Sequence, residues 1–243
     1  MSAQPGSGNG AIWAVIPAAG VGSRMGSELP KQYIELGDAP VIVHTIRSIA
    51  RFKSLKGILV GLSPDDRWWP EAQQQLGDLP CPVTTYAGGA ERAETVLLGL
   101  EKISDEAEPG CWVLVHDAVR PMVRKSDIEH LVNSVAGDPD GGLLALPVAD
   151  TLKSENDGRS NGTVDRSHLW RALTPQYFPV NRLKQALESC SQQGVVVTDE
   201  ASAMETIGAK PRLVTGHTDN IKLTYPSDLE IARMLLANRK EAE

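Results

Sequence analysis

An α/β fold of the Rossmann-like type is predicted for this chain, with a mainly parallel, twisted sheet, helices on both faces and a protruding β-arm. Three observations support this prediction. Short apolar runs alternate with helical patterns from residue 11 to about 148, polar or glycine-rich segments follow several of those runs, and a turn-rich stretch interrupts the alternation at 149–170. Alternation at this spacing implies right-handed crossovers between parallel strands.

The elements follow in order from the apolar pattern. Runs typical of buried strands occupy 12–16, 57–62, 111–116 and 142–148, with a shorter candidate at 82–86. Helical spacing predicts helices over 41–52, 65–76, 91–103 and 126–136, the last beginning at a Ser126 cap. In such sheets ligands bind beyond the carboxyl ends of the strands. The segments after Ile16, Tyr86, His116 and Val148 are therefore the expected binding edge.

The polar stretch 154–162 is flanked by β-like pieces at 148–153 and 163–166, which predicts a hairpin arm. Helices are expected near 180–190 and 199–207, strands near 211–215 and 220–224, and a last helix, capped by Ser227, to about 240. We interpret residues 1–10 as a flexible tail and 11–243 as a single domain, whose arm spans about 149–170.

Composition narrows the function classes. The net charge of −7 argues against a nucleic-acid partner, because that task needs a basic face. The first ten residues lack the pattern of a signal peptide, and no apolar run approaches the roughly 20 residues that cross a bilayer, so no membrane association is expected. Three widely spaced cysteines without a CxxC pair fit a reducing, cytoplasmic setting.

The segment PAAGVGSRMG at 17–26 follows the first strand and has the features of a phosphate loop. Small residues let backbone N–H groups approach phosphate oxygens, and Arg24 and Lys31 add two cations within eight residues. The spacing is not that of a P-loop, which needs GxxxxGK[ST], nor is it the GxGxxG fingerprint of dinucleotide-binding folds.

The same segment, followed by PKQY, resembles the signature of sugar-phosphate nucleotidyltransferases, and the chain is similar to the 2-C-methyl-D-erythritol 4-phosphate cytidylyltransferase family. Seven later segments agree in order: GGAERAETV at 88–96, VHDAVRP at 115–121, PVADTLK at 147–153, TVDR at 163–166, LWRALTPQ at 169–176, TDEASAME at 198–205 and DNIKLTYPSDL at 219–229. The resemblance covers residues 12–236. It implies transfer of CMP from CTP to the acceptor phosphate with release of pyrophosphate.

This reaction needs positioning and charge neutralisation rather than a side-chain nucleophile, because the attacking phosphate is already anionic. The resemblance implies a catalytic set of Arg24, Lys31, Arg166 and Lys222. Without it, Arg24 and Lys31 read as surface cations, and Lys222 as an edge residue of a strand at 220–224. Asp219 is expected either to hold Lys222 or to cap a turn.

For CTP, the resemblance implies contacts with Pro17, Ala18, Ala19, Gly20, Gly22, Gly88, Gly89, Thr95, Asp117 and Ala118. The Thr95 hydroxyl is expected to reach the cytosine edge. The family pattern commonly has Asp and Ser where this chain has Ala90 and Thr95, so Ala90 receives no side-chain role. His116 is expected to be a packed histidine at a strand end, because the chemistry needs no base.

For the sugar-alcohol phosphate, the resemblance implies Asp117, Arg120, Thr151, Arg166, Thr174 and Thr198. Arg120 is alternatively a structural ion-pair partner, and Thr198 and Asp199 read as helix caps. In the family the arm crosses a two-fold homodimer and brings Thr151 and Arg166 to the partner's site. An isolated two-stranded arm is barely stable, which also favours its docking on a second subunit.

Mg²⁺ is expected to accompany CTP and to be held mainly by its phosphates, with Asp117 as the candidate protein ligand. Ribitol-5-phosphate cytidylyltransferase is the nearest alternative, and the TVDR and LTPQ segments favour methylerythritol phosphate. An NAD-dependent oxidoreductase would need GxGxxG and a ribose-binding acid. A silent nucleotide-binding module would be favoured only if Arg24, Lys31 or Lys222 were missing.

Overall fold

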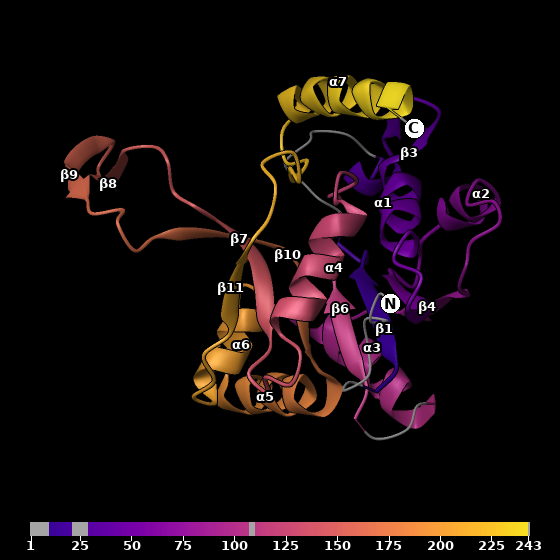
Figure 1. Cartoon of the computed structure of the whole chain (residues 1–243), viewed down its shortest axis with the longest axis horizontal. Coiled ribbons are helices and arrows are strands. Elements are labelled where there is room, and N and C mark those ends of the chain that lie inside the picture. The colour runs from indigo at the N-terminus through magenta and orange to yellow at the C-terminus, as the bar shows by residue number, and fades with distance from the viewer. Residues whose placement is uncertain (1–9, 21–28, 107–109, 243) are drawn as a thin grey trace, which may run out of the picture.

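A seven-stranded sheet forms the centre of the molecule, and β10 is its one strand that runs antiparallel to its neighbours (Figure 1). The computed structural model describes residues 10–20, 29–106 and 110–242. In spatial order the strands are β11 (Arg212–Thr215), β7 (Gly142–Pro147), β10 (Trp170–Pro179), β6 (Trp112–Val115), β1 (Ile12–Pro17), β4 (Leu55–Leu62) and β5 (Val83–Ala87). The predicted mainly parallel sheet is confirmed.

Helices cover both faces of this sheet. They are α1 (Val41–Ala50), α2 (Trp69–Gln74), α3 (Arg92–Glu106), α4 (Lys125–Ser134), α5 (Val180–Gln193), α6 (Glu200–Thr206) and α7 (Pro226–Ala242), with a short 3-10 turn, η2, at Lys31–Tyr33. Alternate strand residues divide the core: Ala14 and Ile16 pack with α1 and α4, whereas Val15 packs with α3, α5 and α6. This alternation is the period-two pattern of a strand buried on both sides.

Strand β10 was not anticipated as a strand, although it lies between β6 and β7. Its pairing with β7 shifts register between Ala172 and Gln176, around Thr174 and Pro175. Proline has no backbone N–H to donate to a strand ladder, so Pro175 and Pro179 argue against a strand when only the sequence is considered. Only burial between two neighbouring strands shows that it belongs to the sheet.

Three predicted boundaries are wrong. Helix α4 begins at Lys125, so Ser126 lies inside it, and Asp127 supplies the acidic group of its first turn. Helix α7 begins at Pro226, and the side chain of Asp228 accepts hydrogen bonds from the Thr224 and Tyr225 amides in place of a Ser227 cap. The predicted strand at 220–224 is an extended segment outside any sheet.

The arm is a hairpin of β8 (Leu152–Asn156) and β9 (Arg159–Val164), which projects away from the central sheet (Figure 1). The two strands extend into the polar stretch 154–162, so the pieces predicted at 148–153 and 163–166 match β8 and β9 only in part. Asp157 and Gly158 both have positive φ, 49° and 71°, as a tight hairpin turn requires. A second small ribbon pairs β2 (Glu35–Leu36) with β3 (Ala39–Pro40).

The three cysteines, all in described ranges, are buried and form no disulfide. Cys81 packs in the core on the α1 side, and Cys111 and Cys190 pack on the α5 side. They therefore act as small apolar side chains. Within the described ranges, no helix is both long enough and apolar enough to cross a bilayer.

Candidate active site

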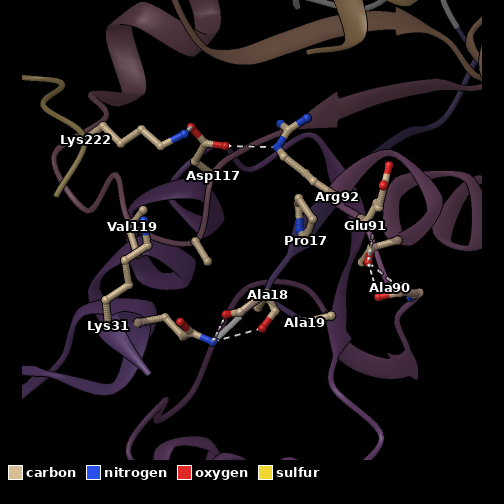
Figure 2. Close-up of a pocket in the computed structure, with 15 residues that line it drawn as sticks. Pro17, Ala18, Ala19, Lys31, Ala90, Glu91, Arg92, Asp117, Val119 and Lys222 are labelled. Carbon is tan, nitrogen blue, oxygen red and sulfur yellow. Dashed lines mark hydrogen bonds and ion pairs between the residues drawn. The ribbon is translucent and has the colours of Figure 1, made fainter. Parts of the chain in front are cut away.

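A cavity of about 340 Å³ opens at the carboxyl ends of β1, β4, β5 and β6 (Figure 2). Its walls come from segments far apart in the sequence: Pro17–Gly20, Lys31, Gln32, Gly89–Arg92, Thr95, Asp117–Val119 and Lys222. Three of the four segments expected at this edge, those after Ile16, Tyr86 and His116, lie here. The fourth, after Val148, leads into the arm.

The first wall is the loop after β1. Its Ala18 amide donates to the Gly61 carbonyl at 2.7 Å, which ties the loop to β4. The buried Gln32 amide nitrogen donates to the carbonyls of Ala18 at 2.9 Å and Gly20 at 3.4 Å. Gln32, in the PKQY segment, therefore shapes the loop while its neighbour Lys31 lines the cavity. Arg24 and Gly22, both predicted site residues, lie outside the described residues.

The facing wall is the glycine pair after β5. A side chain at Gly88 would place its Cβ only 2.6 Å from the Cβ of Ala19, so glycine permits the close approach of the two loops. The Thr95 hydroxyl accepts from the Gly89 amide at 3.1 Å and donates to the Glu91 carbonyl at 3.0 Å. This hydroxyl holds the loop, and its expected contact with cytosine stays a prediction. The Ala90 amide donates to Glu94 at 2.7 Å.

Asp117, in the loop that follows β6, is the side chain on which the charges of the cavity converge. Its Oδ1 lies 3.3 Å from Arg92 Nε, and its Oδ2 lies 3.2 Å from Arg120 Nε and 3.0 Å from Lys222 Nζ. Burial alone would raise the pKa of Asp117, but Arg92, Lys222 and Arg120 outweigh it and hold that pKa well below its usual range. The carboxylate is therefore ionised at neutral pH.

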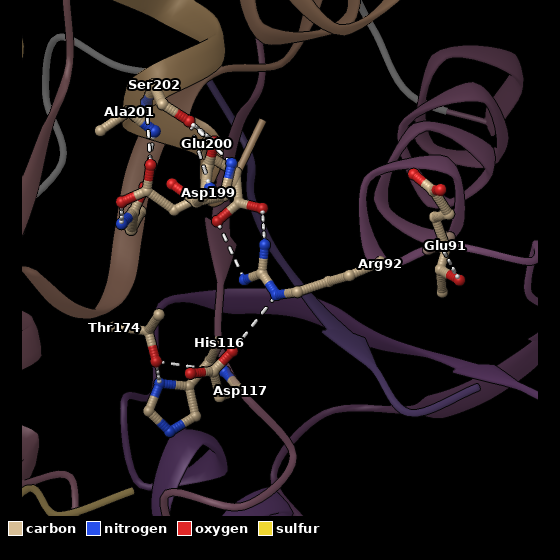
Figure 3. Close-up of polar contacts among 12 residues, drawn as sticks. Glu91, Arg92, His116, Asp117, Thr174, Asp199, Glu200, Ala201 and Ser202 are labelled. Atoms are coloured by element: carbon tan, nitrogen blue, oxygen red, sulfur yellow. Dashed lines mark hydrogen bonds and ion pairs between the residues drawn. The ribbon is translucent and has the colours of Figure 1, made fainter. Parts of the chain in front are cut away.

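Arg92 was missing from the predicted site. Its two terminal nitrogens hold both oxygens of the buried Glu200, at 2.5 and 3.1 Å, while its Nε faces Asp117 (Figure 3). Burial would lower the pKa of Arg92, but Glu200 and Asp117 together raise it. Arg92 lies in the quoted segment GGAERAETV, and Glu200 lies in TDEASAME. Their opposite charges were the sequence signal that could have pointed to this pair.

A second cavity, of about 220 Å³, adjoins the first and contains most of the predicted acceptor-binding residues. Its lining includes Arg120, Thr174, Gln176, Thr198 and Asp199, together with Ala172 and Leu173. Arg92, Asp117 and Lys222 line both cavities. The ion-paired side chains are therefore the common wall of two compartments.

His116 and Thr174 fix the backbone at this wall. Thr174 Oγ1 accepts from the Asp117 amide at 3.1 Å and lies 3.0 Å from His116 Nδ1. The other ring nitrogen, Nε2, lies 3.0 Å from the Arg120 carbonyl, which can only accept, so Nε2 carries the proton and Nδ1 accepts from Thr174. Burial lowers the pKa of His116 to about 4, which makes it a neutral, packed histidine at pH 7.

Lys222 reaches the site from the extended segment before α7. Arg120 Nη1 donates to the Asn220 backbone carbonyl at 2.8 Å, and the Asn220 side-chain Nδ2 donates to the Thr174 carbonyl at 2.7 Å. The Leu223 amide donates to the Val119 carbonyl at 2.9 Å. Asp219 pairs with Arg124 at 2.8 Å. Side-chain and loop hydrogen bonds, rather than a strand ladder, hold this lysine in place.

Comparison with known proteins identifies this arrangement. The profile of 2-C-methyl-D-erythritol 4-phosphate cytidylyltransferase matches residues 12–238. This chain therefore belongs to the 2-C-methyl-D-erythritol 4-phosphate cytidylyltransferase family. The enzyme of that name from Hahella chejuensis is 47% identical over 96% of this chain and 95% of its own length. The one from Acidithiobacillus ferrooxidans is 48% identical over 95% of this chain and 98% of its own.

Solved structures of cytidylyltransferases show the same fold. A crystal structure of 4-diphosphocytidyl-2C-methyl-D-erythritol synthase superimposes with a TM-score of 0.81 at 38% identity, covering 93% of this chain and 98% of that one. The Francisella tularensis 2-C-methyl-D-erythritol 4-phosphate cytidylyltransferase gives 0.77 at 31%, covering 92% and 99%. The resemblance stated from the sequence motifs is confirmed.

Two predicted residues of this cytidylyltransferase lie away from both cavities. Thr151 and Arg166 are exposed on the arm, and an Arg166 nitrogen donates to the Ala149 carbonyl. Neither residue lines a cavity described above. Their predicted role concerns a second subunit, so the position of the arm in this single chain leaves it as a prediction.

The donor set at Asp117 does not by itself form a metal site. Within the part of the chain that the structure describes, no three His, Cys, Asp or Glu side chains gather as metal ligands. Both oxygens of Asp117 already face cations. A divalent ion at Asp117 would have to compete with those cations.

Proposed function

We propose that this chain transfers CMP from CTP to 2-C-methyl-D-erythritol 4-phosphate, giving 4-diphosphocytidyl-2-C-methyl-D-erythritol and pyrophosphate. One observation supports this most directly: two adjoining cavities share Arg92, Asp117 and Lys222 as a common wall. A nucleotide in the larger cavity and a sugar-alcohol phosphate in the smaller one would meet at that wall. Residues 11–243 are proposed to act as one nucleotidyltransferase domain.

The chemistry follows from this placement. An oxygen of the acceptor phosphate forms a bond to the α-phosphorus, the bond to the bridging oxygen of the β-phosphate breaks, and that electron pair leaves with pyrophosphate. Lys222, beside the shared wall, is proposed to align the two phosphates and neutralise charge on the α-phosphate. Lys31, and Arg24 from the loop before it, are proposed to stabilise charge on the leaving pyrophosphate.

The nucleotide is proposed to be held by the backbone of 17–20, by Gly88 and Gly89, and by Thr95, Asp117 and Ala118. Arg120, Thr174 and Thr198 are proposed to hold the acceptor, and Thr151 and Arg166 to complete the site from the arm of a second subunit. Mg²⁺ is proposed to enter on the phosphates of CTP, where it would neutralise part of their charge.

The test is pyrophosphate release from purified protein with CTP, Mg²⁺ and 2-C-methyl-D-erythritol 4-phosphate. We expect release with this acceptor, much slower release with ribitol 5-phosphate, and a loss of about 10²-fold or more in Lys31→Ala, because a charge contact in the transition state is removed. Release only with ribitol 5-phosphate would move the assignment to that acceptor. Wild-type turnover in Lys31→Ala would show that Lys31 has no catalytic role.

A further inference from the structure

A row of alternating charges lies at the shared wall of the two cavities. Figure 3 shows it from Glu200 to Asp117, and Figure 2 shows it from Arg92 to Lys222. It runs from Glu200 through Arg92 and Asp117 to Lys222, and we call these four side chains the charge row. Successive members are joined at 2.5, 3.3 and 3.0 Å. The four come from the start of α6, the start of α3, the end of β6 and the segment before α7.

Glu200 is the buried end of the row. Its side chain is 1% exposed, and it lines neither of the two cavities, whereas Arg92 lines both. Both carboxylate oxygens of Glu200 are bound by the terminal nitrogens of Arg92. A paired carboxylate of this kind supplies geometric precision as well as charge, because the planar guanidinium is held at two points.

This two-point contact sets the orientation of the other side chains of the charge row. With its two terminal nitrogens on Glu200, Arg92 presents Nε to Asp117 Oδ1, and Asp117 keeps Oδ2 for Lys222 and Arg120. If Glu200 were neutral, the two terminal nitrogens of Arg92 would be free to bind Asp117 or a phosphate instead. We propose that Glu200 is a positioning residue, which acts through Arg92 to hold Asp117 and Lys222 in the geometry that CMP transfer requires.

A purely structural role is the competing explanation, in which Glu200 and Arg92 only tie α6 to α3. The start of α6 has other anchors, however. Gln176 accepts from the Ala201 amide at 2.7 Å and donates to Asp199 at 2.8 Å, and Asp199 and Ser202 form a capping box. We therefore expect α6 to stay in place when Glu200 loses its charge, which leaves the positioning role open to measurement.

The experiment rests on the proposed function and compares Glu200→Gln with wild type by steady-state kinetics in CTP and acceptor. We expect kcat to fall about 10-fold while the KM for CTP changes less than about 2-fold, because misplacement of a reacting group acts on the transition state. Arg92→Lys keeps the positive charge but loses the fork, and a similar fall in kcat is expected.

Asp140→Asn is the matched control, because Asp140 also pairs with an arginine, Arg182 at 2.7 Å, but lines neither cavity. We expect its kcat to stay within about 2-fold of wild type. If Glu200→Gln lowers the melting temperature as Asp140→Asn does and keeps wild-type kcat, the pair is only a structural tie and the proposal fails.

A double-mutant cycle tests whether Glu200 acts through Arg92. We expect Glu200→Gln/Arg92→Gln to lose no more than about 2-fold beyond Arg92→Gln alone. Losses that multiply would overturn the proposal, as would wild-type kcat in Arg92→Lys, which decides the matter if Glu200→Gln does not fold. An inactive wild type would instead contradict the proposed function, so the two failures are distinguishable.

Discussion

Asp117 is the side chain on which three ion pairs of the site converge. Three cations share its two oxygens, and they offset the cost of burying the carboxylate. Asp117, Arg120, Lys31 and Lys222 were predictable as candidates from their places in the family-like segments. Arg92 also stands in such a segment, but its pairing with the buried Glu200, 108 positions away, was not predictable. Pairing over such a distance is decided by packing.

His116 makes a pH dependence measurable at this scale. Its pKa in the folded protein is about 4, against 6.5 for a free histidine, so the unfolded chain binds more protons between these values. The stability that comes from a neutral His116 is therefore present above about pH 6.5 and is lost as the pH falls toward 4. A difference of this size corresponds to about 3 kcal/mol in the free energy of unfolding.

The measurement is urea unfolding of wild type and His116→Asn between pH 4 and 7. We expect a smaller loss of stability toward pH 4 in the variant, because its neutral amide does not titrate. Asp117, whose pKa is depressed, begins to lose its stabilising contribution only from about pH 5 downward, and it does so in both proteins, so it does not change the difference between them. Parallel curves for the two proteins would contradict a neutral, buried His116.

Among the elements, β10 combines two roles that its sequence conceals. Its second half pairs with β6 in the centre of the sheet, while the register shift near Thr174 lets that residue bond to His116 and the Asp117 amide. Tyr177 of this strand is fully buried and stacks on Trp112, with 4.6 Å between ring centroids. The strand thus contributes both to the core and to the active-site wall.

We expect Tyr177→Ala to lower the free energy of unfolding by about 3–5 kcal/mol, the cost of removing a large buried ring. Denaturant unfolding measures this. Tyr225→Ala is the control, because Tyr225 is 57% exposed, and its effect is expected to stay within about 0.5 kcal/mol. Equal effects of the two substitutions would show that β10 does not pack in the core as described.

For the whole molecule, the arm is the feature that points beyond a single chain. It projects from the sheet, every residue of β9 is exposed, and Val164, Leu169 and Trp170 are 38, 37 and 38% exposed (Figure 1). A two-stranded ribbon with exposed apolar side chains gains stability by docking on another surface. The proposed homodimer supplies that surface and brings Arg166 to a second active site.

Co-expression of Arg166→Ala with Lys222→Ala subunits tests this arrangement. Each variant alone is expected to be nearly inactive. If Arg166 serves the partner's site, each mixed dimer has one site with both residues intact, and random pairing gives about a quarter of wild-type activity. Activity no greater than that of the two parents would mean that Arg166 acts within its own chain or has no role.

The sequence by itself determined the α/β class, the order of most elements and the segments that meet at the binding edge. Local patterns were enough, because a strand buried on both faces must be apolar and the carboxyl ends of parallel strands share one edge. Motif order was also enough for the family, which the comparisons confirm.

Tertiary structure alone decided the place of β10, the extended path of the Lys222 segment and the charge row through Arg92 and Glu200. In each case the deciding interactions join residues that are far apart in the sequence. The prolines of β10 do not fit a strand pattern, although the strand pairs with its neighbours. Hydrogen bonds from Arg120 and Asn220 take the place of the strand ladder expected at 220–224. The buried Glu200 carboxylate pairs with Arg92 of another helix. Such contacts depend on which surfaces the fold brings together, and local sequence patterns do not show which residues will pair.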